Sequence, residues 1–181
     1  MIEIPTLTAE RLILRGYRES DAPAIAALHG DPDVIKFLSP TGEPEPGLAD
    51  AWEHIARHVG HWALKGCGKW AVDERATGRF VGRVGLYDPP YDWPGLELGW
   101  TLTRDSWGKG YATEAARAAL RWSFEVFGAK EIISAIHPDN AASIRVAERL
   151  GERHLREGAI NGKPCLIYGI SAVEWRAQTH S

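Results

Sequence analysis

The hydrophobic and polar positions of the chain follow two spacings, which predict a mixture of strands and helices. Short apolar runs bounded by turn residues are typical of strands, and longer runs of helix-forming residues are typical of helices. The predicted strands cover 11–17, 69–74, 79–88, 96–103 and 130–137. The predicted helices cover 19–31, 48–64, 109–127 and 138–151. These elements mix without strict alternation, so we expect a mixed sheet with helices on both faces.

Capping and turn residues mark the expected ends of several elements. Ser20 is the predicted N-cap of the first helix. Asp139 or Asn140 caps the helix over 138–151, and Gly151 closes it. Segments rich in proline and glycine must be loops, because neither residue suits the interior of a helix or strand. The predicted loops are 39–47 and 89–95.

Two hairpins are predicted from glycine-containing turns. The strands on either side of Gly78 are joined by the short sequence RATG. The last two strands, 153–159 and 165–175, flank Asn161 and Gly162. Both turns suit a hairpin because glycine and asparagine tolerate positive φ.

Composition narrows the class of protein. A chain of 181 residues suits one compact domain, here 1–181, and a formal charge of −3 argues against general nucleic-acid binding. The two cysteines, Cys67 and Cys165, form neither a disulfide framework nor a zinc site by themselves. The first residues lack a basic-then-apolar leader, and no apolar run approaches the length of a membrane span. We therefore expect a cytoplasmic enzyme or binding protein.

The strongest chemical signal is the stretch RDSWGKGYATEA, residues 104–115, at the start of the long predicted helix. Gly108 and Gly110 flank Lys109, so backbone N–H groups are exposed where a helix adds further unpaired donors. Such donors suit a phosphate or pyrophosphate. The kinase-type pattern GxxxxGK[ST] is absent, and the dinucleotide pattern GxGxxG fails because Thr113 takes the third glycine position.

The order strand, glycine loop, alanine-rich helix, strand and PDNAASIRVAERLG resembles the GNAT superfamily of acetyl-CoA-dependent acetyltransferases. Within it, WGKGYATEA followed by PDNAASIRVAERLG looks like the branch of ribosomal-protein N-terminal acetyltransferases. The resemblance spans Arg11 to Trp175. It implies an α/β (α+β) fold, a three-layer αβα sandwich around a mixed, mostly antiparallel sheet. It also implies transfer of an acetyl group from acetyl-CoA to a primary amine, by direct attack in a ternary complex.

The resemblance assigns a set of residues to the cofactor. Leu102 and Thr103, at the end of a strand, would pair with the pantetheine arm, and Asn140 and Ser143 would face it from the other side. The loop and the first helical turn would hold the pyrophosphate. These residues are Trp107, Gly108, Lys109, Gly110, Tyr111, Ala112 and Thr113. The glycines agree with this, because they remove the Cβ atoms that would block a diphosphate. No metal is implied.

Three positions depart from the superfamily's pattern. Asp105 occupies the first position of [Q/R]xxGxG, where its charge is unfavourable unless the side chain turns away. Ala147 stands where many members carry a tyrosine that protonates the leaving thiolate, and Glu152 replaces a common phenylalanine. Tyr168 is a substitute proton donor on one interpretation and a core residue on another.

Acetyl transfer to an amine requires removal of a proton and stabilisation of the leaving sulfur. Glu97 is the predicted base, acting directly or through water; the alternative is a solvated strand residue in a charge pair. Ser143 is the candidate for the sulfur; the alternative is a serine that only orders the pantetheine.

Histidines and acidic loops carry weaker signals. His54, His58 and His61 lie on one helix face, which suits either a metal or a polar wall of the substrate cleft; HExxH is absent, and we predict no metal. Acidic loop side chains would attract an amine-bearing acceptor or simply be solvated. They are Glu43, Glu45, Asp88 and Asp92.

The sequence leaves three alternatives open. The acceptor is a protein N-terminus or a small-molecule amine. The oligomeric state is monomer or homodimer. In place of an enzyme, Ala147 also suits a non-catalytic acyl-CoA-binding sensor.

Overall fold

The fold is built on one eight-stranded sheet, which a computed structural model describes within residues 3–38, 43–44 and 46–179. The strand order is β1-β2-β3-β4-β5-β6-β8-β7, and only the β5–β6 pair is parallel. The expected mixed, mostly antiparallel sheet is therefore confirmed. The strands are β1 Leu7–Thr8, β2 Leu12–Arg15, β3 Lys69–Glu74, β4 Phe80–Tyr87, β5 Glu97–Leu102, β6 Glu131–Ile136, β7 Arg153–Ile160 and β8 Lys163–Ser171.

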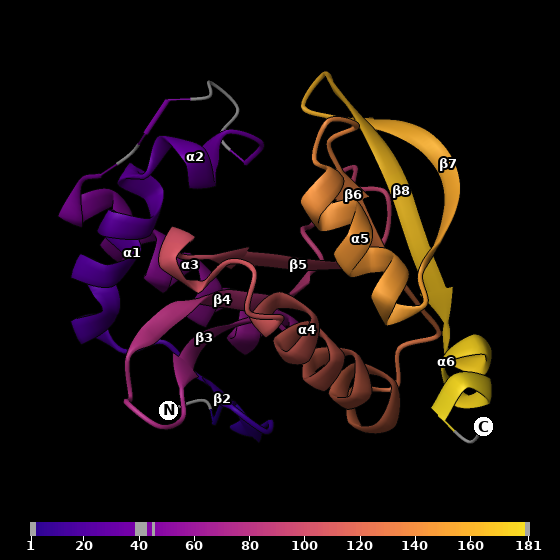
Figure 1. Ribbon diagram of the computed structural model, residues 1–181, viewed down its shortest axis with the longest axis horizontal. Helices are drawn as coiled ribbons and strands as arrows, with labels where there is room; N and C mark the ends of the chain where they lie inside the picture. Colours follow the sequence, from indigo (N-terminus) through magenta and orange to yellow (C-terminus); the bar gives the residue numbers. More distant parts are fainter. Residues whose placement is uncertain (1–2, 39–42, 45, 180–181) are drawn as a thin grey trace.

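Helices cover both faces of the sheet, as expected (Figure 1). The helices are α1 Ala22–Gly30, α2 Pro32–Ile35, α3 Leu48–Lys65, α4 Tyr111–Trp122, α5 Ala141–Leu150 and α6 Ala172–Thr179. Trp70 and Val72 of β3 belong to the core cluster that includes α4, whereas Ala71 packs with α1 and α3. Because neighbouring strand residues point to opposite faces, α4 and the α1–α3 pair lie on opposite sides.

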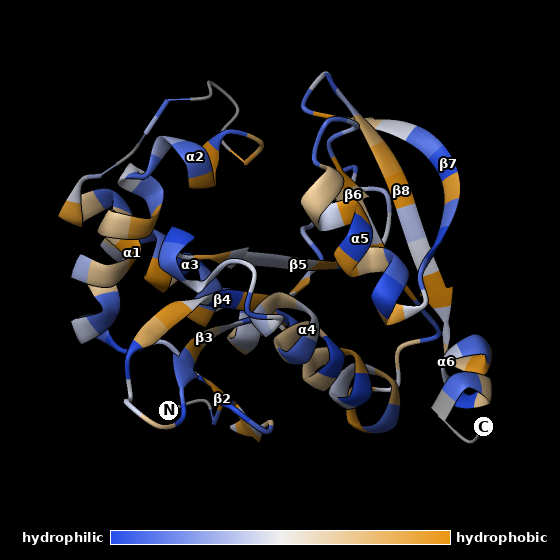
Figure 2. Cartoon of the chain, viewed as in Figure 1, coloured by the Kyte–Doolittle hydropathy of each residue, from blue (hydrophilic) through white to orange (hydrophobic). Residues whose placement is uncertain are grey.

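The second half of the sheet has one exposed edge. β7 is mostly solvent-exposed, and β8 beside it carries the buried residues of the pair. Figure 2 shows hydrophilic segments along β7 and more hydrophobic ones along β8. Among the described residues, no helix is both long and apolar enough to cross a bilayer.

Two predicted boundaries at the chain's ends are wrong. Ser20 is not the N-cap of α1, because the chain first makes a 3₁₀ turn over Glu19–Asp21, in which the Asp21 carboxylate accepts the Arg18 N–H. The last strand ends at Ser171 rather than 175, and α6 follows it. The Glu174 carboxylate accepts the N–H of Ser171, and the Ser171 hydroxyl accepts that of Glu174. This reciprocal pair is a capping box.

The long predicted helix over 109–127 is also divided. Gly110 precedes its first residue, Tyr111, and the last five residues, Ser123–Phe127, form a π-helical turn. Gly128, with φ of 80°, ends it. The helix therefore begins directly at the second glycine of the loop, which places its unpaired N–H groups next to that loop.

The parallel strands β5 and β6 part almost as soon as they meet. Their register holds one pair, Glu97↔Ile133, so the edge of β5 beyond Glu97 has no strand beside it among the described residues. Figure 1 shows the two strands diverging. This opening in the middle of the sheet positions the site described below.

A buried ion-pair network fixes α1 to the sheet. The Arg15 guanidinium donates to Asp21 at 2.8 Å and to Asp73 at 2.6 Å, and all three residues are buried. The Arg15 charge helps to hold the pKa of Asp21 below its usual value, against the opposing effect of burial. Each charge is neutralised by a partner, so the network depends on all of its members.

We expect Arg15→Met to lower the free energy of unfolding by about 3–5 kcal/mol, because it leaves two buried carboxylates without a cation. Urea denaturation measures this loss. Arg121→Met is the control, since Arg121 is exposed on α4, and it should change the free energy by about 0.5 kcal/mol or less. Equal effects of the two substitutions would contradict the assigned role of the network.

Candidate active site

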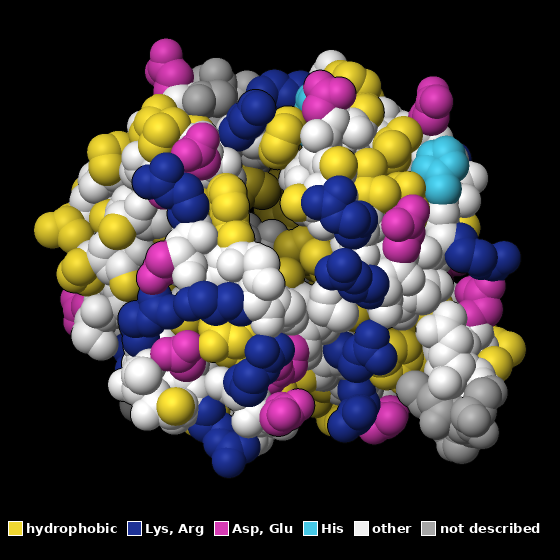
Figure 3. Space-filling view, viewed as in Figure 1, with side chains coloured by type: hydrophobic (Ala, Val, Ile, Leu, Met, Phe, Trp, Pro, Cys, Tyr) yellow, Lys and Arg dark blue, Asp and Glu magenta, His cyan; other side chains and the backbone are white. Residues whose placement is uncertain are grey.

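A cleft of about 490 Å³ lies where β5 and β6 part. Its walls come from α2 and the residues after it, the end of β5, the glycine loop with the start of α4, and α5. Trp100, Thr101 and Leu102 all line it. Because neighbouring residues of a strand point to opposite faces, the cleft wraps around the free edge of β5. Figure 3 shows the hollow with Lys and Arg side chains beside it.

Most of the predicted cofactor residues line this cleft. They are Leu102, Trp107, Gly108, Gly110, Tyr111, Ala112, Thr113, Asn140 and Ser143. Thr103 and Lys109 do not contribute to its lining. The Thr103 hydroxyl instead lies 2.8 Å from Ser106 Oγ, and Lys109 offers its carbonyl to Arg11.

The glycine loop has a left-handed backbone at both glycines. Gly108 has φ of 72° and Gly110 has φ of 79°, a conformation that residues with a Cβ rarely adopt. A Cβ on Gly108 would meet no atom within 4 Å, so backbone conformation rather than internal packing requires this glycine. The N–H groups of Tyr111, Ala112 and Thr113 follow in the first turn of α4, which leaves them without intrahelical acceptors.

Two arginines that the sequence analysis missed hold the loop in place. Arg11 donates to the Lys109 carbonyl at 2.9 Å and binds Glu114 of α4 at 2.7 Å. Arg104 binds Asp33 of α2 at 2.8 Å and so connects the loop to the opposite wall of the cleft. Neither contact has a local sequence signal, because each pair is more than 70 residues apart in the chain.

Asp105 does not face the cleft. Its carboxylate pairs with Arg79, and a hydrogen bond from Thr103 together with this charge holds its pKa below the usual value. The departure from the family pattern at this position is therefore compensated, because the negative charge is neutralised away from the lining.

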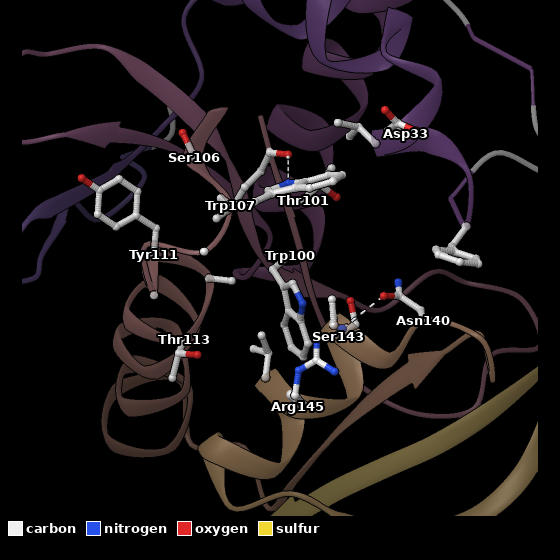
Figure 4. Close-up of a pocket in the computed structure, with 18 of the residues that line it drawn as sticks. Asp33, Trp100, Thr101, Ser106, Trp107, Tyr111, Thr113, Asn140, Ser143 and Arg145 are labelled. Carbon is white, nitrogen blue, oxygen red and sulfur yellow. Dashed lines mark hydrogen bonds between the residues drawn. The ribbon is translucent and has the colours of Figure 1, made fainter. Parts of the chain in front are cut away.

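Trp107 lies inside the cleft (Figure 4). Its indole N–H donates to the Leu102 carbonyl at 3.0 Å, at the free edge of β5. The side chain is 47% exposed, so it is held on one side only. The indole thus occupies a backbone acceptor that a bound molecule pairing with β5 would otherwise use.

The opposite wall is the N-terminal turn of α5. Asn140, rather than Asp139, is the N-cap: its side-chain oxygen accepts the Ser143 N–H at 3.1 Å (Figure 4). Arg145 and Arg149 also line the cleft. Sequence reasoning missed both arginines, although their spacing of four residues places them on one helix face.

Glu97 is a half-buried residue at the last point where β5 and β6 are paired. Its carboxylate accepts the Trp93 indole N–H at 2.8 Å. A Cβ on Gly99 would lie 3.5 Å from Lys69 Nζ and 3.9 Å from Glu97 Oε1, so both charged ends lie over this glycine. Burial raises the pKa of Glu97 and lowers that of Lys69. Glu97 does not line the cleft itself.

Ala147, at the position where many family members carry a tyrosine, and Tyr168, the candidate substitute, are both buried. Ala147 packs with Ile136 and Tyr168 in a small core cluster, and Trp100 contacts that cluster. Tyr168 does not line the cleft, which favours its interpretation as a core residue.

Glu152 forms a buried polar contact beneath α5. Ser134 Oγ lies 3.0 Å from both the Leu98 carbonyl oxygen and Glu152 Oε1. A hydroxyl has one hydrogen, so both contacts are hydrogen bonds only when Glu152 is protonated and donates to Ser134. Burial raises the pKa of Glu152 to about 8, which agrees with this arrangement.

The predicted histidines and acidic loop residues do not form a metal site among the described residues. His54 and His58 lie together, with 4.4 Å between their ring centroids, whereas the His61 ring is held by contacts with the Cys67 carbonyl and the Asp88 N–H. The part of the chain that the structure describes contains no group of three or more His, Cys, Asp or Glu residues arranged for a metal ion. Asp88 also binds Lys65 at 2.8 Å, and Glu45 lies outside the described residues.

Comparison with known proteins shows the family to which the chain belongs. The model of the acetyltransferase (GNAT) domain matches residues 11–153. The chain belongs to the GNAT acetyltransferase family. The expected enzyme class, an N-acetyltransferase, is confirmed, and the family uses acetyl-CoA. The alternative of a non-catalytic sensor is not favoured.

Two individual proteins match the chain over most of its length, the first of them an uncharacterized protein. YkkB of Bacillus subtilis is 31% identical over 169 residues, which cover 90% of this chain and 93% of the relative. The acetyltransferase from Agrobacterium tumefaciens has a similar structure, with a TM-score of 0.81, 32% identity and coverage of 94% and 96% of the two chains. The GNAT fold is therefore confirmed.

The narrower branch is supported by fold alone. The ribosomal-protein-S5-alanine acetyltransferase from Vibrio fischeri matches with a TM-score of 0.75 at 18% identity, covering 95% of this chain and 99% of that one. An identity this low supports a shared fold but does not indicate which acceptor this chain uses. Membership of the ribosomal-protein branch stays a prediction.

Glu152→Gln tests the protonated state of the buried carboxyl. An unfolded glutamate titrates near pH 4.3, so between about pH 5 and 8 the folded wild type binds the extra proton and loses stability as pH rises, by up to about 1.4 kcal/mol per unit. The variant keeps the side chain's shape without this titration.

The free energies of unfolding of wild type and Glu152→Gln should therefore be similar near pH 5, with the variant more stable at pH 8. Urea denaturation at several pH values measures the difference. A difference that does not change with pH would show that Glu152 titrates normally.

Proposed function

We propose that the protein binds acetyl-CoA along the free edge of β5 and transfers its acetyl group to a primary amine in a ternary complex. The observation that carries this proposal is the cleft itself, which joins the edge of β5 to the glycine loop and the first turn of α4. A bound acetyl-CoA supplies an activated thioester. The residues of this chain bind it, orient the amine and remove the amine's proton.

The donor set of the loop fits a diphosphate. The N–H groups from Gly108 to Thr113 are available at the positive end of α4, and the glycines add no Cβ atoms. The guanidinium groups of Arg145 and Arg149 add positive charge along the α5 wall, which suits the phosphates of coenzyme A. Lys109 would act mainly through its backbone, since its carbonyl is fixed by Arg11.

The pantetheine arm would pair with β5 near Leu102 and Thr103 and pass the N-terminal turn of α5. Asn140 and Ser143 line that turn with polar groups. Trp107 would leave the Leu102 carbonyl as the arm enters, because both need the same acceptor. The half-exposed indole can move without opening the core.

Glu97 would accept the proton from the amine, directly or through water. Its position at the inner end of the parted strands supports this role, and so does the raised pKa, which brings a carboxylate closer to the basicity needed near neutral pH. Ser143 would donate to the leaving sulfur or order the pantetheine. The acceptor is a small-molecule amine or a protein N-terminus.

Two glycines provide a matched test of the cofactor site. Gly108 and Gly78 have φ of 72° and 71°, and a Cβ on either would meet no atom within 4 Å. Alanine should therefore cost both sites similar strain, about 1–2 kcal/mol.

We expect Gly108→Ala to weaken acetyl-CoA binding at least about tenfold, or 1.4 kcal/mol, and Gly78→Ala to leave the affinity unchanged. Isothermal titration calorimetry on both folded variants measures this. Wild-type affinity in Gly108→Ala would remove the loop from the cofactor site.

Glu97→Gln tests the proposed base. Turnover with an amine should fall by about 10²–10⁴-fold, while acetyl-CoA affinity changes little. The wild-type rate should rise with pH through the raised pKa of Glu97, and the variant should lose this dependence. Thiol release measured over a pH series gives both results.

Glu125→Gln, at an exposed residue after α4, is the control and should keep the wild-type profile. An unchanged rate of Glu97→Gln at every pH would exclude Glu97 as the base.

A further inference from the structure

The face of the sheet beneath α1 and α3 carries charged residues in neighbouring cross-strand rows. Strand register sets the rows. They are Ala71–Arg83–Thr101, Lys69–Gly85–Gly99 and Tyr87–Glu97. Arg83, Lys69 and Glu97 therefore share one face, and the two glycines leave room between them. This face lies on the opposite side of β5 from Leu98 in the α4 core.

Arg83 is a buried cation without an ion pair among the described residues. It is 8% exposed, and its Nε has no hydrogen-bond partner. Arg15, which pairs with Ala71 in the same row, is buried to a similar extent but binds both Asp21 and Asp73. These two carboxylates are thus already used by Arg15.

Four further polar atoms near Arg83 lack partners. They are Tyr17 Oη, His29 Nε2, His54 Nε2 and His58 Nδ1. The rings form one cluster: His54 lies 4.4 Å from His58 and 4.7 Å from His29 between ring centroids, and Tyr17 stacks on His58 at 6.0 Å. Together with Arg83 Nε, five buried side-chain atoms without a hydrogen-bond partner therefore lie in one region of the described residues. Buried polar groups normally have partners.

The charges of this region do not balance. Arg83 is buried and Lys69 is half-buried with a pKa that burial lowers, and the one carboxylate that shares these rows is Glu97, whose pKa is raised by burial. Burial and the nearby cations lower the pKa of His54 and His58, so both imidazoles are neutral and each can donate one hydrogen bond. The Arg83 Nε–H is a donor, the Tyr17 hydroxyl can donate, and each neutral histidine can present its unpaired nitrogen as a donor in one of its two tautomers. These groups lie beside the positive charge of Arg83. An anionic group satisfies both conditions.

We propose that Arg83, with Tyr17, His54 and His58, binds an anionic group of the acetyl acceptor. The acceptor is then a small amine that also carries a carboxylate or a phosphate. This inference rests on the proposed acetyl transfer and names its substrate class. Glu97 pairs with Tyr87 of β4, and Tyr87 is four residues from Arg83 on the same strand, which is about 13 Å. Lys69 lies in the row between them. A small molecule of this length would place its anionic group at Arg83 and its amine near Glu97.

A kinetic comparison of matched amines tests the substrate class. The panel pairs glycine with glycinamide, β-alanine with its amide, and phosphoethanolamine with ethanolamine. We expect the best acid-bearing amine to exceed its neutral partner about 30-fold or more in kcat/KM, because a buried charge pair is being made. Comparison of glycine and β-alanine with phosphoethanolamine shows whether the preferred anionic group is a carboxylate or a phosphate. A peptide N-terminus in the same panel tests the rival acceptor.

Arg83→Met should remove this preference while acetyl-CoA affinity stays as in wild type. The variant should fold, because it replaces an unpaired buried charge with an apolar side chain of similar length. Arg83→Lys keeps the charge and should retain part of the preference. Arg121→Met, at an exposed residue of α4, is the control and should leave the preference intact.

A binding measurement without turnover separates this inference from the proposed function. N-acetylglycine should raise the thermal midpoint of wild type more than N-acetylglycinamide, and Arg83→Met should abolish the difference. Inorganic phosphate serves as the second anionic probe. If no amine is acetylated, the proposed function fails, and this measurement still decides the anion site.

Equal response of wild type to acid and amide, a preference for neutral amines or peptides, or an unchanged acid preference in Arg83→Met would each overturn the inference.

Discussion

The parting of two parallel strands is the constraint on which the rest of the site depends. β5 and β6 share one pair, Glu97↔Ile133, and then diverge, so the edge of β5 that faces β6 is free although β5 lies in the middle of the sheet. A free edge in the middle of a sheet would normally be a liability, because its backbone groups lack partners. Here the edge of β5 lines a cleft, and its Leu102 carbonyl accepts a hydrogen bond from the Trp107 indole.

The two faces of β5 carry different groups: those suited to the cofactor lie on one side, and those proposed for the acceptor lie on the other. On one side, the glycine loop, α4 and α5 offer backbone donors and cations suited to a phosphate-rich molecule. On the other side, Glu97, Lys69 and Arg83 lie under α1 and α3 among neutral histidines. The contrast between Arg15 and Arg83 is informative, because the same buried cation has two carboxylates at one position and none at the other. We therefore interpret the paired Arg15 as a structural residue and the unpaired Arg83 as a ligand-binding residue.

Local signals in the sequence predicted most of the elements and the glycine loop. Gly110, Gly128 and Gly151 mark helix ends because each needs positive φ, and such signals lie within a few residues. The predictions failed where a side chain acts at a distance or reciprocally. Asp21 displaced Ser20 as the start of the first helix by binding Arg15, and the Ser171–Glu174 capping box was hidden inside an apolar run. The cluster around Arg83 was predicted only in part: helical spacing placed His54 and His58 on one face, but the packing of α1 and α3 over the sheet, which no local pattern shows, brings them to Arg83.

Calorimetric titration with acetyl-CoA, with ATP and NAD as competitors, tests the central claim most directly. We expect selective binding of acetyl-CoA with a Kd on the order of micromolar, about −8 kcal/mol, and no comparable binding of the other two nucleotides. Absence of binding, or a preference for ATP or NAD, would contradict it. In that case the cleft along β5 would not be a coenzyme A site, and the roles assigned to its lining would be wrong.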